Sequence, residues 1–118
     1  MSTAGERLYD LSLIEEMAGG DEDFMKEMAE TFVSSVPPVV ESMLHFSKTH
    51  EWLKMADAAH SLKSNIDTLQ ILCIKEEIRM IERNGKAFVD LDIIPDLVVK
   101  VVNVLNLAMD QIKIQYKL

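Results

Sequence analysis

Apolar residues recur every three or four positions through four long stretches of this chain, and this spacing constrains the fold more than any other feature. Before residue 70 the expected buried line is Trp52, Met55, Ala59, Leu62, Ile66 and Leu69. Near the C-terminus, within 94–116, it is Leu97, Val101, Leu105, Ala108 and Ile112. A period of three to four residues places such side chains on one face of an α-helix. The chain is therefore predicted to be all-α.

Turn and capping residues set the expected helix ends. A short helix, capped by Asp10 or Ser12, ends at Gly19-Gly20. A long helix follows over 21–47, with the apolar stripe Phe24, Met28, Phe32, Val36, Val39, Val40, Met43 and Phe46. Pro37-Pro38 predicts a kink or a local break within one helix. A later helix, with faces marked by Leu69, Leu72, Cys73, Glu76, Met80 and Arg83, stops at Asn84-Gly85, and 86–92 form a loop.

Short connections between long amphipathic helices predict an antiparallel up-and-down four-helix bundle with a short additional N-terminal helix. The 118 residues suit one domain over 1–118, with 1–9 flexible. Aromatic residues make up only 6% of the chain, so aliphatic residues and eight methionines build the core.

Charge and targeting signals narrow the partners. The net charge of −8 argues against nucleic acid, because phosphate binding needs a basic face. The acid is concentrated in residues 1–59, which hold twelve acidic and four basic residues, whereas 60–118 hold eight of each. No signal peptide or membrane span is visible, which predicts a cytoplasmic protein without a membrane partner. Cys73, the single cysteine, is expected to be a buried packing thiol.

Candidate chemistry gathers at His60 and Lys63, which are one helical turn apart and therefore neighbours on the helix surface. His60 lies on the polar margin of its helix, where a lone histidine is often only a solvated or capping residue. A ferritin-like metal site needs two Glu-x-x-His pairs, and the chain offers only Asp57-x-x-His60. His45 and His50 have poor metal spacing and are expected on the surface. No Gly-rich phosphate loop or oxyanion-hole element is present, which leaves His60 itself as the reacting group.

Imidazole is a competent nucleophile at neutral pH, because one ring nitrogen is then free to attack. Attack on a phosphoryl group gives a phosphoramidate that can pass the group on. Lys63 supplies a cation beside the ring to offset the phosphoryl charge. The chain shows no Mg²⁺ ligands, so we expect no cofactor of its own and a metal ion brought by the partner.

The segment Ala59-His60-Ser61-Leu62-Lys63 resembles the Ala-His-x-Leu-Lys signature of histidine-containing phosphotransfer (HPt) domains, the carriers of multistep phosphorelays. The likeness extends over roughly residues 10–88. Phe32-Val33-x-x-Val36-Pro37 resembles the long second helix of that family, and His50-Glu51-Trp52-Leu53 resembles the turn into the active helix. Leu72-Cys73 followed by Ile81-Glu82 resembles the helix after it, and the last helix fits the closing helix of the bundle without a motif.

The resemblance implies a function in two-component signal transduction. His60 would be phosphorylated on Nε2 by a receiver-domain aspartyl phosphate, and would hand the group to another receiver aspartate. Lys63 matches the lysine that positions and neutralises the phosphoryl group, and Glu82 matches a position, frequently Gln, that contacts Nδ1. The partners would be receiver domains of response regulators or hybrid histidine kinases, with Mg²⁺ on the receiver. The chain would be a carrier without kinase activity of its own. Its expected docking surface comprises Leu11, Ile14, Met17, Asp57, Ser61, Ser64 and Asp67.

Two positions depart from the family pattern. Ser64 stands where a glycine usually gives the receiver close access, and Gln70 replaces a second frequent glycine ten residues after His60. The competing hypothesis is a helical-bundle adaptor that binds a receiver or a kinase domain and never takes the phosphoryl group. Met1 and a complete final helix favour a free-standing protein over a domain of a larger hybrid kinase, but leave both open.

Overall fold

The computed structural model describes residues 6–118, and all regular structure within them is helical. The α-helices are α1 (Ser12–Ala18), α2 (Glu22–Lys48), α3 (Trp52–Thr68), α4 (Lys75–Ala87) and α5 (Ile94–Tyr116). Two 3₁₀ turns, η2 (Leu72–Ile74) and η3 (Leu91–Ile93), precede α4 and α5. The predicted all-α class is confirmed.

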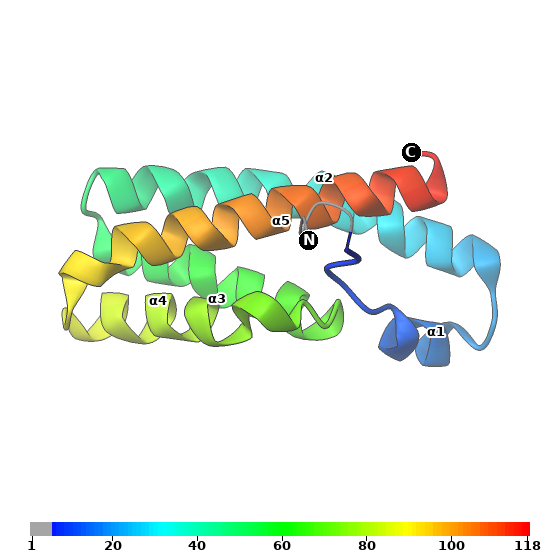
Figure 1. Ribbon diagram of the computed structural model, residues 1–118, viewed down its shortest axis with the longest axis horizontal. Helices are drawn as coiled ribbons and strands as arrows, with labels where there is room; N and C mark the ends of the chain where they lie inside the picture. The colour runs from blue at the N-terminus through cyan, green and yellow to red at the C-terminus, as the bar shows by residue number, and fades with distance from the viewer. Residues whose placement is uncertain (1–5) are drawn as a thin grey trace.

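Helices α2 to α5 run up and down beside one another and form an elongated bundle of 44 × 30 × 20 Å. Figure 1 shows that α2 and α5 are longer than α3 and α4 and extend past them at one end, where α1 lies. The bundle with a short additional N-terminal helix agrees with the prediction from sequence. No helix within 6–118 combines the length and the apolar content needed to cross a membrane.

The predicted apolar stripes form the core. On α3, Met55, Ala59 and Leu62 are fully buried, and Ile66 is 1% exposed. On α5, Val101, Leu105 and Ala108 are fully buried. Burial of aliphatic side chains removes apolar surface from water at about 25 cal/mol per Å². These two stripes pin the opposite, polar faces of the helices toward solvent.

Helix α2 continues through Pro37 and Pro38 without a break, as one helix. Its start is capped by Asp21, whose carboxylate accepts a hydrogen bond from the Phe24 amide at 3.1 Å. Both prolines lack an amide donor, but the buried residues Val36 and Val40 on either side hold the backbone in the core. The single helix is confirmed and the local break is wrong.

The predicted stop at Asn84-Gly85 is also wrong, because α4 runs on to Ala87 and ends at Phe88 in the left-handed region. Asn84 and Gly85 are both buried against the neighbouring helix rather than exposed in a turn. The expected loop over 86–92 is correspondingly shorter, and η3 occupies its end. A glycine that permits close helix packing was thus mistaken for a terminator.

Cys73 is exposed, which contradicts the prediction of a buried thiol. It lies in η2, where the tighter 3₁₀ winding changes which side chains face inward. Ile71 and Ile74 are buried there, whereas Leu72 and Cys73 face solvent.

The flexible segment predicted over 1–9 is only partly described, because residues 1–5 lie outside the described part of the chain. Tyr9 is buried, and the Leu8 amide donates to Gln111 Oε1 at 2.9 Å. The Asp10 amide donates to the Leu69 carbonyl at 2.9 Å. Residues 8–10 are therefore fastened to α5 and to the end of α3.

Candidate functional site around His60

His60 projects from the middle of α3 with 62% of its side chain exposed. Its neighbours in sequence explain this placement, because Ala59 and Leu62 are fully buried and fix the rotation of the helix. A residue next to a buried position on a helix is turned by about 100° from it. The histidine therefore stands on the rim of α3, facing solvent and α4.

Helix α4 brings Glu82 to the ring. Glu82 is only 8% exposed and follows the buried Ile81 on the face that packs against α3. Gly85, one turn later, permits this close approach. A Cβ at Gly85 would lie 2.8 Å from Met55 Cε and 3.1 Å from the Trp52 carbonyl oxygen. The absence of a side chain at Gly85 thus sets how near Glu82 comes to His60.

The Glu82 carboxylate is the centre of a network of three donors. Its Oε2 lies 2.7 Å from His60 Nδ1 and accepts a hydrogen bond from Lys86 Nζ at 2.9 Å. Its Oε1 accepts a hydrogen bond from Lys63 Nζ at 2.8 Å. Glu82 therefore joins α3 to α4 and holds the imidazole and two ammonium groups around one carboxylate.

The electrostatics of this network fix the state of the ring. Burial raises the pKa of Glu82, but hydrogen bonds from Lys63, Lys86 and His60 outweigh it and lower that pKa to about 2. An ionised carboxylate can only accept hydrogen bonds, so Nδ1 must carry the proton that it shares with Glu82. In the neutral ring the lone pair is then on Nε2. The arrangement presents a nucleophilic nitrogen on the exposed side of α3.

The sequence placed His60, Lys63 and Glu82 in one site, and the structure brings these three side chains together. Lys86 was missed, because the predicted helix ended before it. The signal that would have found it is the spacing Glu82-x-x-x-Lys86, which puts the two side chains on one helix face.

Three of the predicted docking residues on α3 are exposed beside the histidine, namely Asp57, Ser61 and Ser64. Asp67 is half-buried and its carboxylate forms an ion pair with Arg79 of α4 at 2.7 Å. This pair, like Glu82 with Lys63, ties α3 to α4 rather than leaving the acid free for a partner.

Two of the predicted docking residues near the N-terminal helix are buried and cannot contact a partner. Leu11 and Ile14 are 8% and 2% exposed, because both pack into the core beneath α1. Met17, on the outer side of α1, is 67% exposed. Only Met17 of these three offers its side chain to a partner.

Gln70 adopts a φ of 50°, in the left-handed region that favours glycine. This position follows the end of α3, and the backbone there turns toward η2. The side-chain Nε2 of Gln70 donates to the Asp10 carbonyl at 3.1 Å and to Ser12 Oγ at 3.2 Å. The side chain that stands in place of glycine therefore fastens the start of α1 to the end of α3.

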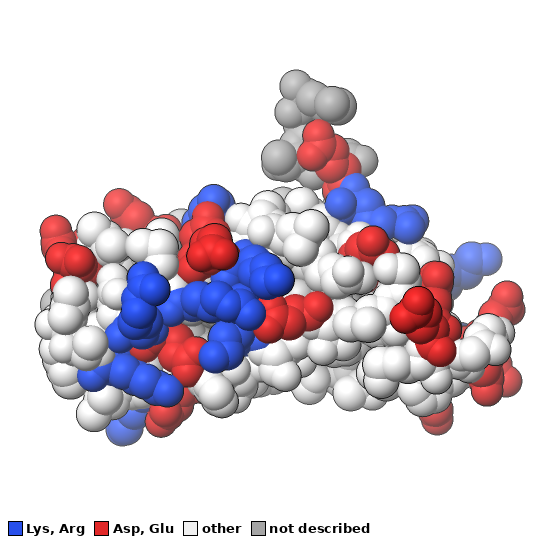
Figure 2. Space-filling model, turned by 90° about the horizontal axis from the view of Figure 1, so that it is seen from below, with Lys and Arg blue, Asp and Glu red and all other residues white. Residues whose placement is uncertain are grey.

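Basic side chains gather on the face formed by α3 and α4. Figure 2 shows Lys and Arg clustered on this face, with acidic residues between them and further acidic residues toward the two ends of the molecule. Arg79, Arg83 and Lys86 recur at helical spacing on α4, and Lys63 adds a fourth cation from α3. Three of these cations are paired with acids of the same face, Lys63 and Lys86 with Glu82 and Arg79 with Asp67.

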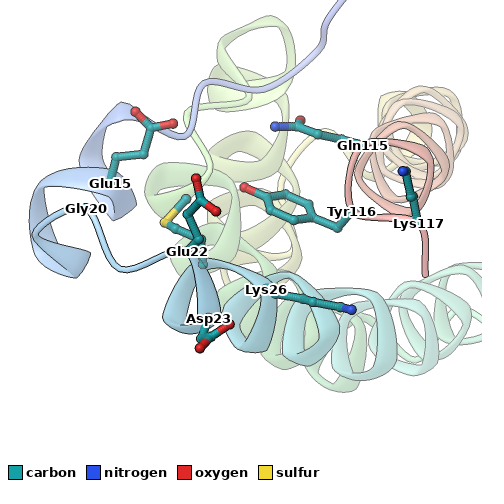
Figure 3. Close-up of a pocket in the computed structure, with 9 residues that line it drawn as sticks. Glu15, Gly20, Glu22, Asp23, Lys26, Gln115, Tyr116 and Lys117 are labelled. Atoms are coloured by element: carbon teal, nitrogen blue, oxygen red, sulfur yellow. The ribbon is translucent and has the colours of Figure 1, made fainter.

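A separate hollow of about 580 Å³ lies at the end of the bundle where α1 lies, between α1, the start of α2 and the end of α5. Figure 3 shows Glu22 and Tyr116 on facing sides of it, with Lys26 and Lys117 at its margin. None of its lining residues belongs to α3 or α4, so it is distinct from the His60 network. Within 6–118, no three His, Cys, Asp or Glu side chains group as a metal site.

Comparisons of the chain with protein-family models, with curated proteins and with solved structures find no match.

Proposed function

We propose that the chain is a histidine phosphotransfer protein of two-component signalling, which carries a phosphoryl group on His60 between receiver-domain aspartates. The observation that carries the proposal is the contact of a buried, ionised Glu82 with Nδ1 of an exposed histidine. This contact leaves the Nε2 lone pair facing solvent, where the active site of another domain can close over it. The resemblance to HPt domains points to the same function.

This geometry supports the following steps of transfer. The Nε2 lone pair attacks the phosphorus of a receiver aspartyl phosphate, the P–O bond to the aspartate breaks, and the aspartate leaves as a carboxylate. The ring then carries a positive charge, which the Glu82 carboxylate stabilises through Nδ1–H. Lys63 neutralises charge on the phosphoryl oxygens. A second receiver aspartate reverses these steps, with Mg²⁺ held by the receiver.

The proposal also covers where the protein acts and what it binds. The protein would be cytoplasmic, would have no kinase activity of its own and would bind neither nucleic acid nor membrane. Its docking surface would include Met17, Asp57, Ser61 and Ser64, which are exposed on α1 and α3.

Incubation with a phosphorylated receiver domain and Mg²⁺ tests the proposal. We expect acid-labile phosphate on wild-type protein, mapped to His60 by mass spectrometry, and none on His60→Gln. His50→Gln is the matched control, because His50 is also exposed but lies at the turn before α3. Label on His60→Gln, or none on wild type with any receiver of the source organism, contradicts the proposal. Stable binding of a receiver without transfer would support the adaptor hypothesis instead.

A further inference from the structure

Asn84-Gly85, in the last turns of α4, is the only Asn-Gly pair in the chain. Such a pair can react with itself and then with water. The glycine backbone nitrogen attacks the amide carbon of the asparagine side chain, ammonia leaves, and a five-membered succinimide forms. Water then opens the ring to aspartate or to isoaspartate. Glycine favours the attack, because it has no side chain to obstruct its backbone nitrogen and leaves the backbone free to turn.

The folded helix holds both ends of the peptide group that must turn in this reaction. Asn84 is only 6% exposed. Its carbonyl accepts hydrogen bonds from the Phe88 amide and, at 3.2 Å, from the Val89 amide. The Gly85 amide lies inside α4, where a helical amide donates to the carbonyl four residues earlier. The Gly85 nitrogen therefore cannot swing toward the side chain of Asn84 while α4 is intact.

The neighbouring helix also leaves this backbone no room. A Cβ at Gly85 would lie 2.8 Å from Met55 Cε and 3.1 Å from the Trp52 carbonyl oxygen, both on α3. Rotation of the backbone at Gly85 thus requires that α4 first moves away from α3.

Side-chain contacts with α3 oppose this movement. Lys63 Nζ lies 2.8 Å from Glu82 Oε1, and Arg79 pairs with Asp67 at 2.7 Å. Glu82 is two residues before Asn84, so its contact with α3 lies within one helical turn of the reactive pair. Loss of this contact would raise the fraction of time for which α4 is detached.

We propose that Asn84-Gly85 is a latent deamidation site, which the packing of α4 on α3 protects and which reacts when α4 detaches or unfolds. The products do not return to the native packing. Isoaspartate inserts a methylene group into the backbone of α4, and both products place a carboxylate at a buried position. Deamidation is therefore one-way and marks the chains in which α4 has opened. The site depends on the fold alone and not on phosphorylation of His60.

Incubation of wild-type protein at neutral pH, folded in buffer and unfolded in guanidinium chloride, tests the site. Peptide mass spectrometry follows the replacement of ammonia by water at Asn84. We expect the rate in the folded protein to be at least about tenfold lower, because it is limited by the population of the open form. The asparagines followed by bulky residues are internal controls that should remain amides in guanidinium chloride over the same time: Asn65, Asn103 and Asn106.

Gly85→Ala tests the chemistry in guanidinium chloride, where the stability of the variant does not matter. The added methyl group hinders the attack, so Asn84 should react severalfold more slowly than in wild type. An Asn84 that stays an amide in unfolded wild type would overturn the site. Equal rates in folded and unfolded wild type would overturn its protection.

Glu82→Gln tests whether the contact with α3 supplies the protection. We expect Asn84 to react severalfold faster in this variant than in wild type when both are folded, and equally fast in guanidinium chloride. Arg79→Gln, which removes the pair with Asp67, should change the rate in the same direction. Glu41→Gln is the matched control, because Glu41 is exposed on α2 and the substitution is the same. Circular dichroism shows that each variant is folded, and folded variants that react no faster than wild type would overturn the protection by α3.

The proposed function and the deamidation site can fail separately. Wild-type protein that takes no phosphoryl group from a receiver would contradict the first and leave the second unchanged. An unreactive Asn84 would do the opposite.

Discussion

At the scale of single residues, Glu82 is the side chain whose chemistry depends most on its surroundings. It is nearly buried, yet three donors keep it ionised. A lone buried carboxylate would take up a proton instead, and a protonated Glu82 could donate a hydrogen bond to Nδ1. The ring proton would then be on Nε2, and no lone pair would face solvent. The lysines therefore act on His60 through the charge of Glu82.

The low pKa of Glu82 makes stability depend on pH. This pKa falls from 4.5 to about 2 on folding. A carboxyl group with a lowered pKa stabilises the fold above its unfolded pKa, and that stability is lost as the pH falls toward the folded pKa. The shift corresponds to about 2–3 kcal/mol once the exposure of the lysines is allowed for.

We therefore expect the free energy of unfolding of wild type to fall more steeply than that of Glu82→Gln between about pH 5 and pH 2. Urea denaturation across this range measures both curves. Other carboxyl groups titrate in both proteins, so the difference between the curves reports Glu82 alone. Parallel curves would show that Glu82 is not held ionised by its partners.

Gln70 combines an unfavourable backbone with a useful side chain. A non-glycine residue in the left-handed region costs about 1–2 kcal/mol, and the two hydrogen bonds to the start of α1 offset part of this cost. We expect Gln70→Ala to destabilise the fold by about 0.5–1 kcal/mol, because it loses the hydrogen bonds and keeps the strain. Gln70→Gly, which relieves the strain, should be more stable than Gln70→Ala in urea denaturation. Equal stability of the two variants would argue against strain at this turn.

At the scale of helices, the close packing of α4 on α3 positions the site. A methyl group at Gly85 would press on Met55 and on the Trp52 carbonyl oxygen, at 2.8 Å and 3.1 Å. The methionine can move, but the backbone oxygen cannot move without shifting the helix. Glu82, one turn earlier, would then be displaced from His60.

We expect Gly85→Ala to destabilise the protein by about 1–3 kcal/mol, although alanine favours a helix over glycine by about 1 kcal/mol. It should also slow phosphorylation of His60 by phosphoramidate. Thermal and urea unfolding give the first result, and ³¹P NMR gives the second. Arg83→Ala, at an exposed position of the same helix, should change stability by less than about 0.5 kcal/mol. A stabilised Gly85→Ala would show that the helices have room to separate.

The helices around Gly85 show what the sequence could and could not predict. The apolar period predicted α3 and α5 and the rotation that exposes His60, because burial of a stripe dominates helix orientation. Gly85 was mistaken for a stop, because a glycine that ends a helix and one that admits a neighbour look alike without the neighbour. That error removed Lys86 from α4 and hid its spacing from Glu82.

Burial at the helix ends was the other feature that the sequence did not predict. The 3₁₀ turn η2 changes the side-chain period just before α4, and Cys73 faces solvent as a result. Helices α2 and α5 extend past α3 and α4 at the end where α1 lies (Figure 1), and Leu11 and Ile14 are buried in the core there. The burial of Leu11 and Ile14 depends on the relative lengths of the helices, which no local pattern contains.

At the scale of the whole molecule, the charges are separated in a way that the net value of −8 conceals. Four of the chain's basic residues, Lys63, Arg79, Arg83 and Lys86, lie on the face around His60, where acidic residues stand among them (Figure 2). A receiver domain that holds Mg²⁺ must present carboxylates around its aspartate, because Mg²⁺ is bound through oxygen ligands. Opposite charges would then steer the two active sites together.

Reversal of one charge on this face tests the steering. Arg83 is exposed on α4 next to Glu82 in sequence. We expect Arg83→Glu to lower the rate of transfer from a phosphorylated receiver severalfold at low salt, and the difference from wild type to shrink at high salt, where the Debye length falls to about 3 Å. Labelling by phosphoramidate, which has no docking face, should be unaffected. Lys113→Glu on α5 makes the same change of net charge away from His60, so an equal loss in both variants would mean that overall charge, and not the basic face, governs the encounter.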